Sequence, residues 1–321
     1  MHRRPLLTAA LLGAAAPARA QSAPWPSRPV TLLVPYVAGG PSDTLARAVS
    51  VPLGAAIGQP VVVENRPGGN GAVAAQLTLR AAPDGHTLFI AASGILTLNP
   101  YVMAHLPYDP VRDFAPLTVA IAAPNLLVAH PAFPPGTVAE TIAWLKAHPN
   151  QASYGTSGIG SSEHLTMELF AQRTGTQLTH VPYGGGAAAT TDLIAGTTQL
   201  SFLNIATVSS QVQAGALKGI ATGGSERHPL FPAVPTVAET LPGFEGGSWH
   251  SFVAPAATPE AVLARIHAAL AACLRLPEVE VRLTRIGFSV VASTRAEMAA
   301  RVASELARWK DVVRAAGIRP A

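Results

Sequence analysis

The chain runs Thr31-Leu-Leu-Val-Pro-Tyr36 and then Val-Ala-Gly39-Gly40-Pro-Ser42-Asp43 into Thr44-Leu-Ala-Arg47. An apolar stretch typical of a β-strand therefore ends in a glycine-rich loop, and small polar residues that can cap a helix close the loop. A strand, loop and helix in this order direct backbone N–H groups and the positive end of a helix dipole at one place. The pattern predicts an anion site, with these candidate binding residues: Tyr36, Gly39, Gly40, Ser42 and Asp43.

A second stretch repeats this arrangement as Ser153-Tyr-Gly155-Thr156-Ser157-Gly158-Ile-Gly160-Ser161-Ser162, followed by a helical run to Gln172. It holds more glycine, serine and threonine than a turn needs, which suits a carboxylate or phosphate. The candidates here are Thr156, Ser157, Gly158, Ser161 and Ser162. His164, on the first helical turn, is a further candidate, although a packed or solvated role explains it as well. Two facing loops of this kind predict a protein that holds a small acid between them.

Further glycine-rich connections follow predicted strands at Gly69-Asn70-Gly71 and at Tyr183-Gly-Gly-Gly186. Each is either a contact loop or a plain connection. We include Asn70, Ser93 and Tyr183 among the candidate ligand-binding residues.

Strand-like and helical segments alternate in two separate parts of the chain, which predicts an α/β fold with parallel sheets. The first unit reads as strands 30–36, 61–64 and 87–92 with helices 44–57 and 72–80, and residues 99–116 read as irregular. The second unit has strands 125–129, 152–155, 178–181, 199–203 and 218–222 with helices 137–146, 164–172 and 187–195. Strand 248–254 leads back to the first unit, and helices follow from 258 and 294. We therefore expect two lobes, 21–123 with 250–321 and 124–249, and a ligand cleft between them.

The N-terminus has the features of a secretory signal peptide, residues 1–20. A basic start at His2-Arg-Arg4 precedes the apolar run 6–16, and Ala18-Arg-Ala20 is a cleavage motif. We expect a periplasmic protein that begins near Gln21, exported by the Sec or the twin-arginine route. Without the leader's three arginines, the 22 basic residues fall to 19 against 18 acidic ones. This near-neutral balance does not favour nucleic-acid binding.

Sequence patterns of catalytic and cofactor sites are incomplete in this chain. Gly155-Thr-Ser157-Gly-Ile159 lacks the last glycine of a hydrolase nucleophile elbow. The G-x-G-x-x-A pattern from Gly69 lacks the acidic partner of a dinucleotide site. The ten histidines show no metal-ligand spacing, and Cys273 falls on an apolar helix face. We expect no enzyme activity, cofactor or metal, and a hydrolase or lyase on the same scaffold remains a remote alternative.

These patterns resemble one family, the Bug receptors, which are the periplasmic solute-binding proteins of tripartite tricarboxylate transporters. The resemblance spans most of the mature chain and rests on an ordered series of blocks: Val34-Pro-Tyr36, Gly39-Gly40, Asp43-Thr-Leu-Ala-Arg47, Asn65-Arg-Pro-Gly68, Pro83-Asp-Gly-His-Thr-Leu88, Leu106-Pro-Tyr-Asp-Pro110, Asp113-Phe114, Tyr154-Gly-Thr-Ser-Gly158, His164-Leu165, His180-Val-Pro-Tyr183, Asp192-Leu193, Val234-Pro-Thr-Val-Ala-Glu239, Pro242-Gly-Phe-Glu245 and Trp249.

The resemblance implies a type II periplasmic-binding-protein fold and a monomeric receptor that closes on a small carboxylate and passes it to membrane permease subunits. A receptor that feeds a sensory two-component system is the alternative. Asn204 matches a family asparagine and joins the candidates. Gly184 and Leu203 replace a lysine and an aspartate that are common in the family, and Val37-Ala38 replaces a proline pair. An ammonium group needs an acidic partner, so these changes favour organic acids without an amine.

Overall fold

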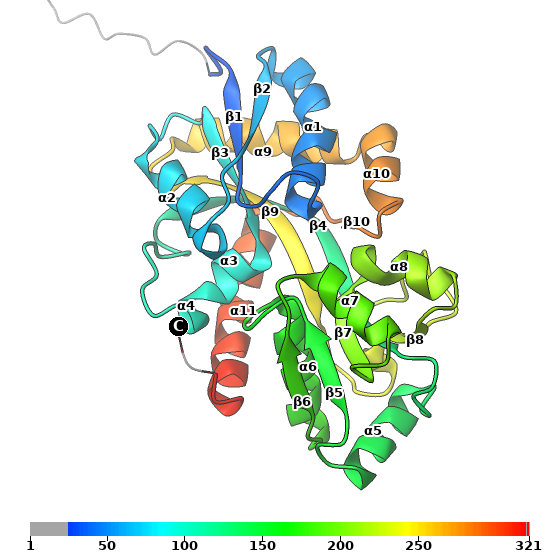
Figure 1. The fold of residues 1–321 in the computed structure, drawn as a ribbon. Helices are drawn as coiled ribbons and strands as arrows, with labels where there is room; N and C mark the ends of the chain where they lie inside the picture. Colours follow the sequence, from blue (N-terminus) through cyan, green and yellow to red (C-terminus); the bar gives the residue numbers. More distant parts are fainter. Residues whose placement is uncertain (1–24, 319, 321) are drawn as a thin grey trace, which may run out of the picture.

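Figure 1 shows a computed structural model in which residues 25–318 and 320 are described. It has two α/β lobes, as predicted, and the long strands β4 (Phe114–Ala129) and β9 (Gly247–Pro255) pass from one lobe to the other (Figure 1). The leader predicted at residues 1–20 lies outside the described residues.

The upper lobe in Figure 1 is built from the two ends of the described chain. Its elements are β1 (Val30–Val34), α1 (Pro41–Ile57), β2 (Val61–Asn65), the 3-10 turn Gly69–Gly71, α2 (Ala72–Arg80), β3 (Thr87–Ala92), α3 (Ser93–Thr97), α4 (Asn99–Val102), α9 (Glu260–Leu274), α10 (Pro277–Thr284), β10 (Ser289–Val290) and α11 (Arg295–Ala315).

The lower lobe is built from the middle of the chain (Figure 1). Its elements are α5 (Val138–Ala147), β5 (Ser153–Thr156), α6 (Ser162–Thr174), β6 (Thr179–Pro182), α7 (Gly186–Ile194), β7 (Leu200–Asn204), α8 (Ile205–Gln213), β8 (Lys218–Thr222) and the 3-10 turn Val237–Glu239.

One continuous sheet joins the lobes in the order β2-β1-β3-β9-β4-β7-β5-β6, and β8 and β10 also pair with β4. Strands β1, β2 and β3 are parallel, as are β5, β6 and β7. The first half of β4 pairs with β9 and β10, and the second half pairs with β7 and β8. The antiparallel pair β4 and β9 therefore lies between the two sets of parallel strands and connects them.

Helix α4 covers Asn99–Val102 and strand β4 begins at Phe114, so the expectation of irregular structure over residues 99–116 was wrong at both ends. The many prolines of this stretch are typical of irregular structure, and β4 itself contains Pro116 and Pro124. The pairing of β4 with β9 shifts register between Pro116 and Thr118 and again after Val119. Such irregularities accommodate residues that cannot donate a ladder hydrogen bond.

Local sequence explains where several helices begin. Thr137 and Thr294 each form a capping box, with Glu140 and Glu297 respectively, at the start of α5 and α11. Helix α1 has Pro41 at its first turn and ends at Gly58 in the left-handed conformation. These ends match the boundaries expected from sequence to within a few residues.

Helix α11 packs against the cores of both lobes. Met298 and Val302, near its start, belong to a buried cluster with Phe89 and Trp249. Its later residues, among them Trp309, belong to the buried cluster of the lower lobe. The helix therefore ties the two lobes together on one side of the molecule.

Candidate ligand cleft

A cleft of about 730 Å³ lies between the lobes, within the size range of small-molecule sites. The upper lobe and β9 contribute Tyr36, Pro41, Asn70, Ala92, Ser93, Gly94, Leu98, Val102, Met103, Ser248 and His250. The lower lobe contributes Ser157, Gly158, Ile159, Gly160, Ser161, Ser162, Glu163, Gly185, Gly186, Asn204 and Thr207.

The starts of four helices of nine residues or more line this cleft, and the short helix α3 also begins there, at Ser93. Helix α1 begins there at Pro41, α6 at Ser162, α7 at Gly186, and α8 follows Asn204. This placement follows from parallel strands, whose carboxyl ends lead into the next helix at one edge of the sheet. Among residues 25–318, no side chain caps the first N–H groups of α1 or α7. Their N–H groups and helix dipoles make the cleft favourable for an anion.

The structure places eight candidates on the cleft: Tyr36, Asn70, Ser93, Ser157, Gly158, Ser161, Ser162 and Asn204. The other seven, Gly39, Gly40, Ser42, Asp43, Thr156, His164 and Tyr183, lie outside its lining. Several of these seven form hydrogen bonds that stabilise the two glycine-rich loops, the first at residues 36–43 and the second at residues 156–162.

Asp43 organises the first loop rather than facing the cleft. Its carboxylate accepts the Gly39 N–H at 2.9 Å, Arg47 Nε at 2.9 Å and Asn65 Nδ2 at 3.0 Å. Burial raises the pKa of Asp43, but these hydrogen bonds outweigh burial and leave the pKa below its ordinary value. An ionised Asp43 therefore closes the loop onto α1 and β2.

Ser42 lies outside the cleft lining but contacts His250, which is part of it. Its hydroxyl is fully buried and lies 2.9 Å from Nδ1 of His250, which itself lines the cleft. Burial lowers the pKa of His250 to about 4, so its imidazole is neutral at pH 7. The pair fixes the ring on β9 without adding charge to the site.

Ser157 and Ser161, on the second loop, are already engaged within the chain. Ser157 Oγ donates to Glu163 Oε2 at 2.6 Å, and Ser161 Oγ accepts the His164 N–H at 3.2 Å as the cap of α6. The backbone N–H groups of the loop and of the first turn of α6 are therefore better placed than these hydroxyls to bind a ligand.

A stack of aromatic rings lies behind the second loop. The rings of His164 and His180 are 3.9 Å apart, and Tyr154 stacks on His180. Thr156 Oγ1 lies 2.7 Å from His180 Nε2, and His164 Nδ1 accepts the Gly160 N–H at 3.1 Å. Burial, and then the electrostatic effect of His180, lower the pKa of His164 to about 3. Burial lowers the pKa of His180 to about 4. Both are neutral at pH 7 and support the loop.

Tyr183 and Asn70 also make contacts within their own lobe. Tyr183 donates its hydroxyl to Asp192 at 2.6 Å and so tethers the loop before α7. Asn70, which lines the cleft, donates from Nδ2 to Asn99 Oδ1 at 2.6 Å. Asn204, at the start of α8, donates to Ser248 Oγ at 3.0 Å.

Sequence reasoning missed Glu163 and His250, which both line the cleft. Glu163 is the second residue of α6, where an acidic side chain is common because it offsets the helix dipole. Its hydrogen bond with Ser157 depends on the conformation of the second loop. His250 is brought to the cleft by strand β9, 208 residues along the chain from Ser42.

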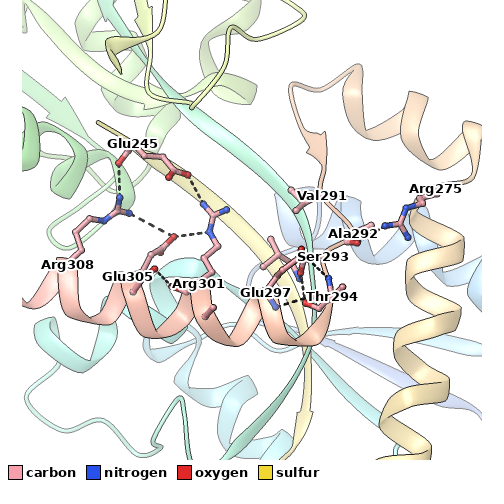
Figure 2. Close-up of a pocket in the computed structure, with 13 residues that line it drawn as sticks. Glu245, Arg275, Val291, Ala292, Ser293, Thr294, Glu297, Arg301, Glu305 and Arg308 are labelled. Carbon is pink, nitrogen blue, oxygen red and sulfur yellow. Dashed lines mark hydrogen bonds and ion pairs between the residues drawn. The ribbon is translucent and has the colours of Figure 1, made fainter. Parts of the chain in front are cut away.

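A larger cavity of about 920 Å³ lies along α11 (Figure 2). Arg301 bridges Glu245 and Glu305, each at 3.0 Å, and Arg308 donates to the Glu245 carbonyl at 3.2 Å. Trp249 Nε1 donates to Glu305 at 2.7 Å. Because these charges satisfy one another, the cavity is a poorer anion site than the inter-lobe cleft.

This fold and cleft are those of a two-lobed α/β binding protein. Residues 45–318 match the family described as tripartite tricarboxylate transporter family receptor. The chain belongs to this family, whose members are periplasmic substrate-binding proteins.

Relatives match over nearly the whole chain. Protein BugT of Bordetella pertussis is 32% identical over 312 residues, which cover 97% of this chain and 95% of BugT. Rpa4515 of R. palustris, solved with adipate, is 36% identical with a TM-score of 0.80, covering 92% of this chain and 100% of that one. MatC (Rpa3494) of Rhodopseudomonas palustris, solved with bound malate, is 33% identical with a TM-score of 0.75, covering 90% and 100%.

Within the described residues, no helix combines the length and the apolar character needed to cross a membrane.

Proposed function

We propose that this protein is a periplasmic receptor, not an enzyme, that binds a small organic acid in the inter-lobe cleft and delivers it to a tripartite tricarboxylate transporter permease. The observation that carries the proposal is the convergence of the starts of α1, α6, α7 and α8 on one cleft of about 730 Å³. Helix N-termini bind carboxylates without a basic side chain. Two relatives with more than 30% identity were solved with carboxylates, adipate and malate.

The proposed lobes are residues 21–123 with 250–321 and residues 124–249, and the proposed leader is 1–20. The ligand lies between the first loop, near Tyr36 and Pro41, and the second loop, near Ser157 to Ser162. The monomer captures the acid by bringing these loops together. A receptor for a sensory system would bind its ligand in the same cleft, and pairing with a permease follows from the family.

A pair of blocking variants tests which cavity binds the acid. Ser162→Trp places an indole in the inter-lobe cleft, and Ser304→Trp places one in the cavity along α11. Adipate and malate serve as probes in titration calorimetry, and thermal unfolding checks that each variant is folded. We expect Ser162→Trp to abolish binding and Ser304→Trp to leave the dissociation constant unchanged. Loss of binding in Ser304→Trp alone would move the site to α11 and contradict the proposal.

A further inference from the structure

Glu163 places a carboxylate in a cleft that is otherwise suited to anions. Among the described lining residues, it is the one aspartate, glutamate, lysine or arginine, and burial lowers the pKa of the lining His250 to about 4. The residue is 7% exposed. Within residues 25–318, the carboxylate makes one side-chain hydrogen bond, in which Oε2 accepts from Ser157 Oγ at 2.6 Å.

A carboxylate buried to this extent is normally paired with a cation. No lysine, arginine or histidine in the described part of the chain forms an ion pair with Glu163. One serine hydroxyl and the first turn of α6 offset only part of the cost of removing the charge from water. A positively charged group in the cleft would complete the pairing.

The surroundings of Glu163 indicate where such a group would lie. Burial, and then the negative charge of Glu163, raise the pKa of Tyr36 to about 12. The phenol of Tyr36 comes from the loop after β1 in the upper lobe, whereas Glu163 comes from α6 in the lower lobe. Glu163 therefore acts across the cleft, and a ligand between the lobes lies within its field.

We propose that the ligand carries a cationic group, an ammonium, in addition to its carboxylate, and that Glu163 binds this group. The inference rests on the proposed function, because the carboxylate end is still held at the helix N-termini. It also changes the expectation drawn from Leu203. That residue is fully buried in the core and is not part of the cleft lining, so its lack of charge does not decide the ligand. The acidic partner comes from the first turn of α6 instead.

Matched probes test the charge preference directly. Aspartate has the skeleton of malate with an ammonium in place of the hydroxyl. In 6-aminohexanoate, a methylammonium replaces one carboxylate of adipate. Charge-assisted hydrogen bonds are worth enough to change affinity by roughly ten- to a hundred-fold. We expect the wild-type protein to bind the amine-containing member of at least one pair about tenfold more tightly than its partner.

Glu163→Gln removes the charge and keeps both the shape and an oxygen that accepts from Ser157. We expect this variant to bind the preferred amine about tenfold less tightly than the wild type and the matching amine-free acid at least as tightly as before. Glu168→Gln is the control, because Glu168 lies on the same helix, accepts the Tyr154 hydroxyl at 2.6 Å and is outside the cleft lining. It should leave the preference unchanged.

Three results would contradict the inference. Tighter binding of malate and adipate than of both amines by the wild type would overturn it, and so would an unchanged preference in Glu163→Gln that still unfolds like the wild type. Either result leaves the receptor function intact, because a carboxylate still binds. If none of the four probes binds the wild-type protein, the proposed function fails and the inference fails with it.

Discussion

The contact between Gly160 and Val102 is a point where the second loop meets the upper lobe. Gly160 has φ +74°, and a Cβ placed on it would lie 3.1 Å from both methyl groups of Val102 and 3.2 Å from its Cβ. Val102 ends α4, and both residues line the cleft. Glycine is therefore required at 160 by its backbone conformation and by the closeness of the two chain segments.

Gly160→Ala should have two separable effects. A side chain in the left-handed region costs about 1–2 kcal/mol of stability. The added methyl group also forces the loop and α4 apart by a few tenths of an ångström, which moves the N–H groups of α6 relative to the upper lobe. We expect adipate to bind roughly tenfold more weakly, equivalent to about 1.4 kcal/mol.

Val102→Gly removes all three contacted atoms, so it provides the second arm of a double-mutant cycle. The double variant should recover most of the affinity that Gly160→Ala loses, but not the stability lost to backbone strain. Urea unfolding measures stability and titration calorimetry measures adipate affinity for all four proteins. The reasoning is refuted if Gly160→Ala binds adipate as tightly as the wild type, or if Val102→Gly restores none of the lost affinity.

Other predictions concern pH, the first loop and the leader. The unfolded histidines bind protons at a higher pH than folded His164 and His180, whose pKa values are about 3 and about 4. Stability should therefore fall as the pH drops from about 6.5 towards 4, by up to about 1.4 kcal/mol per pH unit for each histidine. Urea midpoints across this range measure the fall, and a flat profile would contradict the buried, neutral stack. Asp43→Asn loses a charged acceptor for Gly39 and Arg47 and should destabilise the fold by about 1–3 kcal/mol, whereas an unchanged urea midpoint would show that the loop does not depend on it. N-terminal sequencing of the exported protein should begin at or near Gln21, and a secreted product that retains Met1 would exclude cleavage.

The alternation of apolar and helical segments was enough to predict most of the fold. Strands such as β1 and β3 are bounded by turn signals, so each could be recognised locally. The first half of β4 was missed because its stability comes from pairing with β9, more than 120 residues later in the chain. Helices α3, α4, α8 and α10 were not predicted. Helix α8 begins directly after β7, so no turn signal separates the two elements.

The site was predictable to the extent that it depends on strand–loop–helix geometry. Tyr36, Ser157 and Ser162 were found because they follow strands whose ends share one edge of the sheet. Residues such as Asp43 and Thr156 have suitable chemistry, but the side chains point to neighbours within the lobe. That orientation depends on packing, which residue type and spacing do not reveal.

A crystal structure of the protein grown with adipate or 6-aminohexanoate tests the central claim most directly. The account predicts density for the acid in the inter-lobe cleft, with its carboxylate at the N–H groups of α1, α6 or α7. Density for the acid along α11, beside Arg301 and Arg308, with an empty inter-lobe cleft, would contradict it.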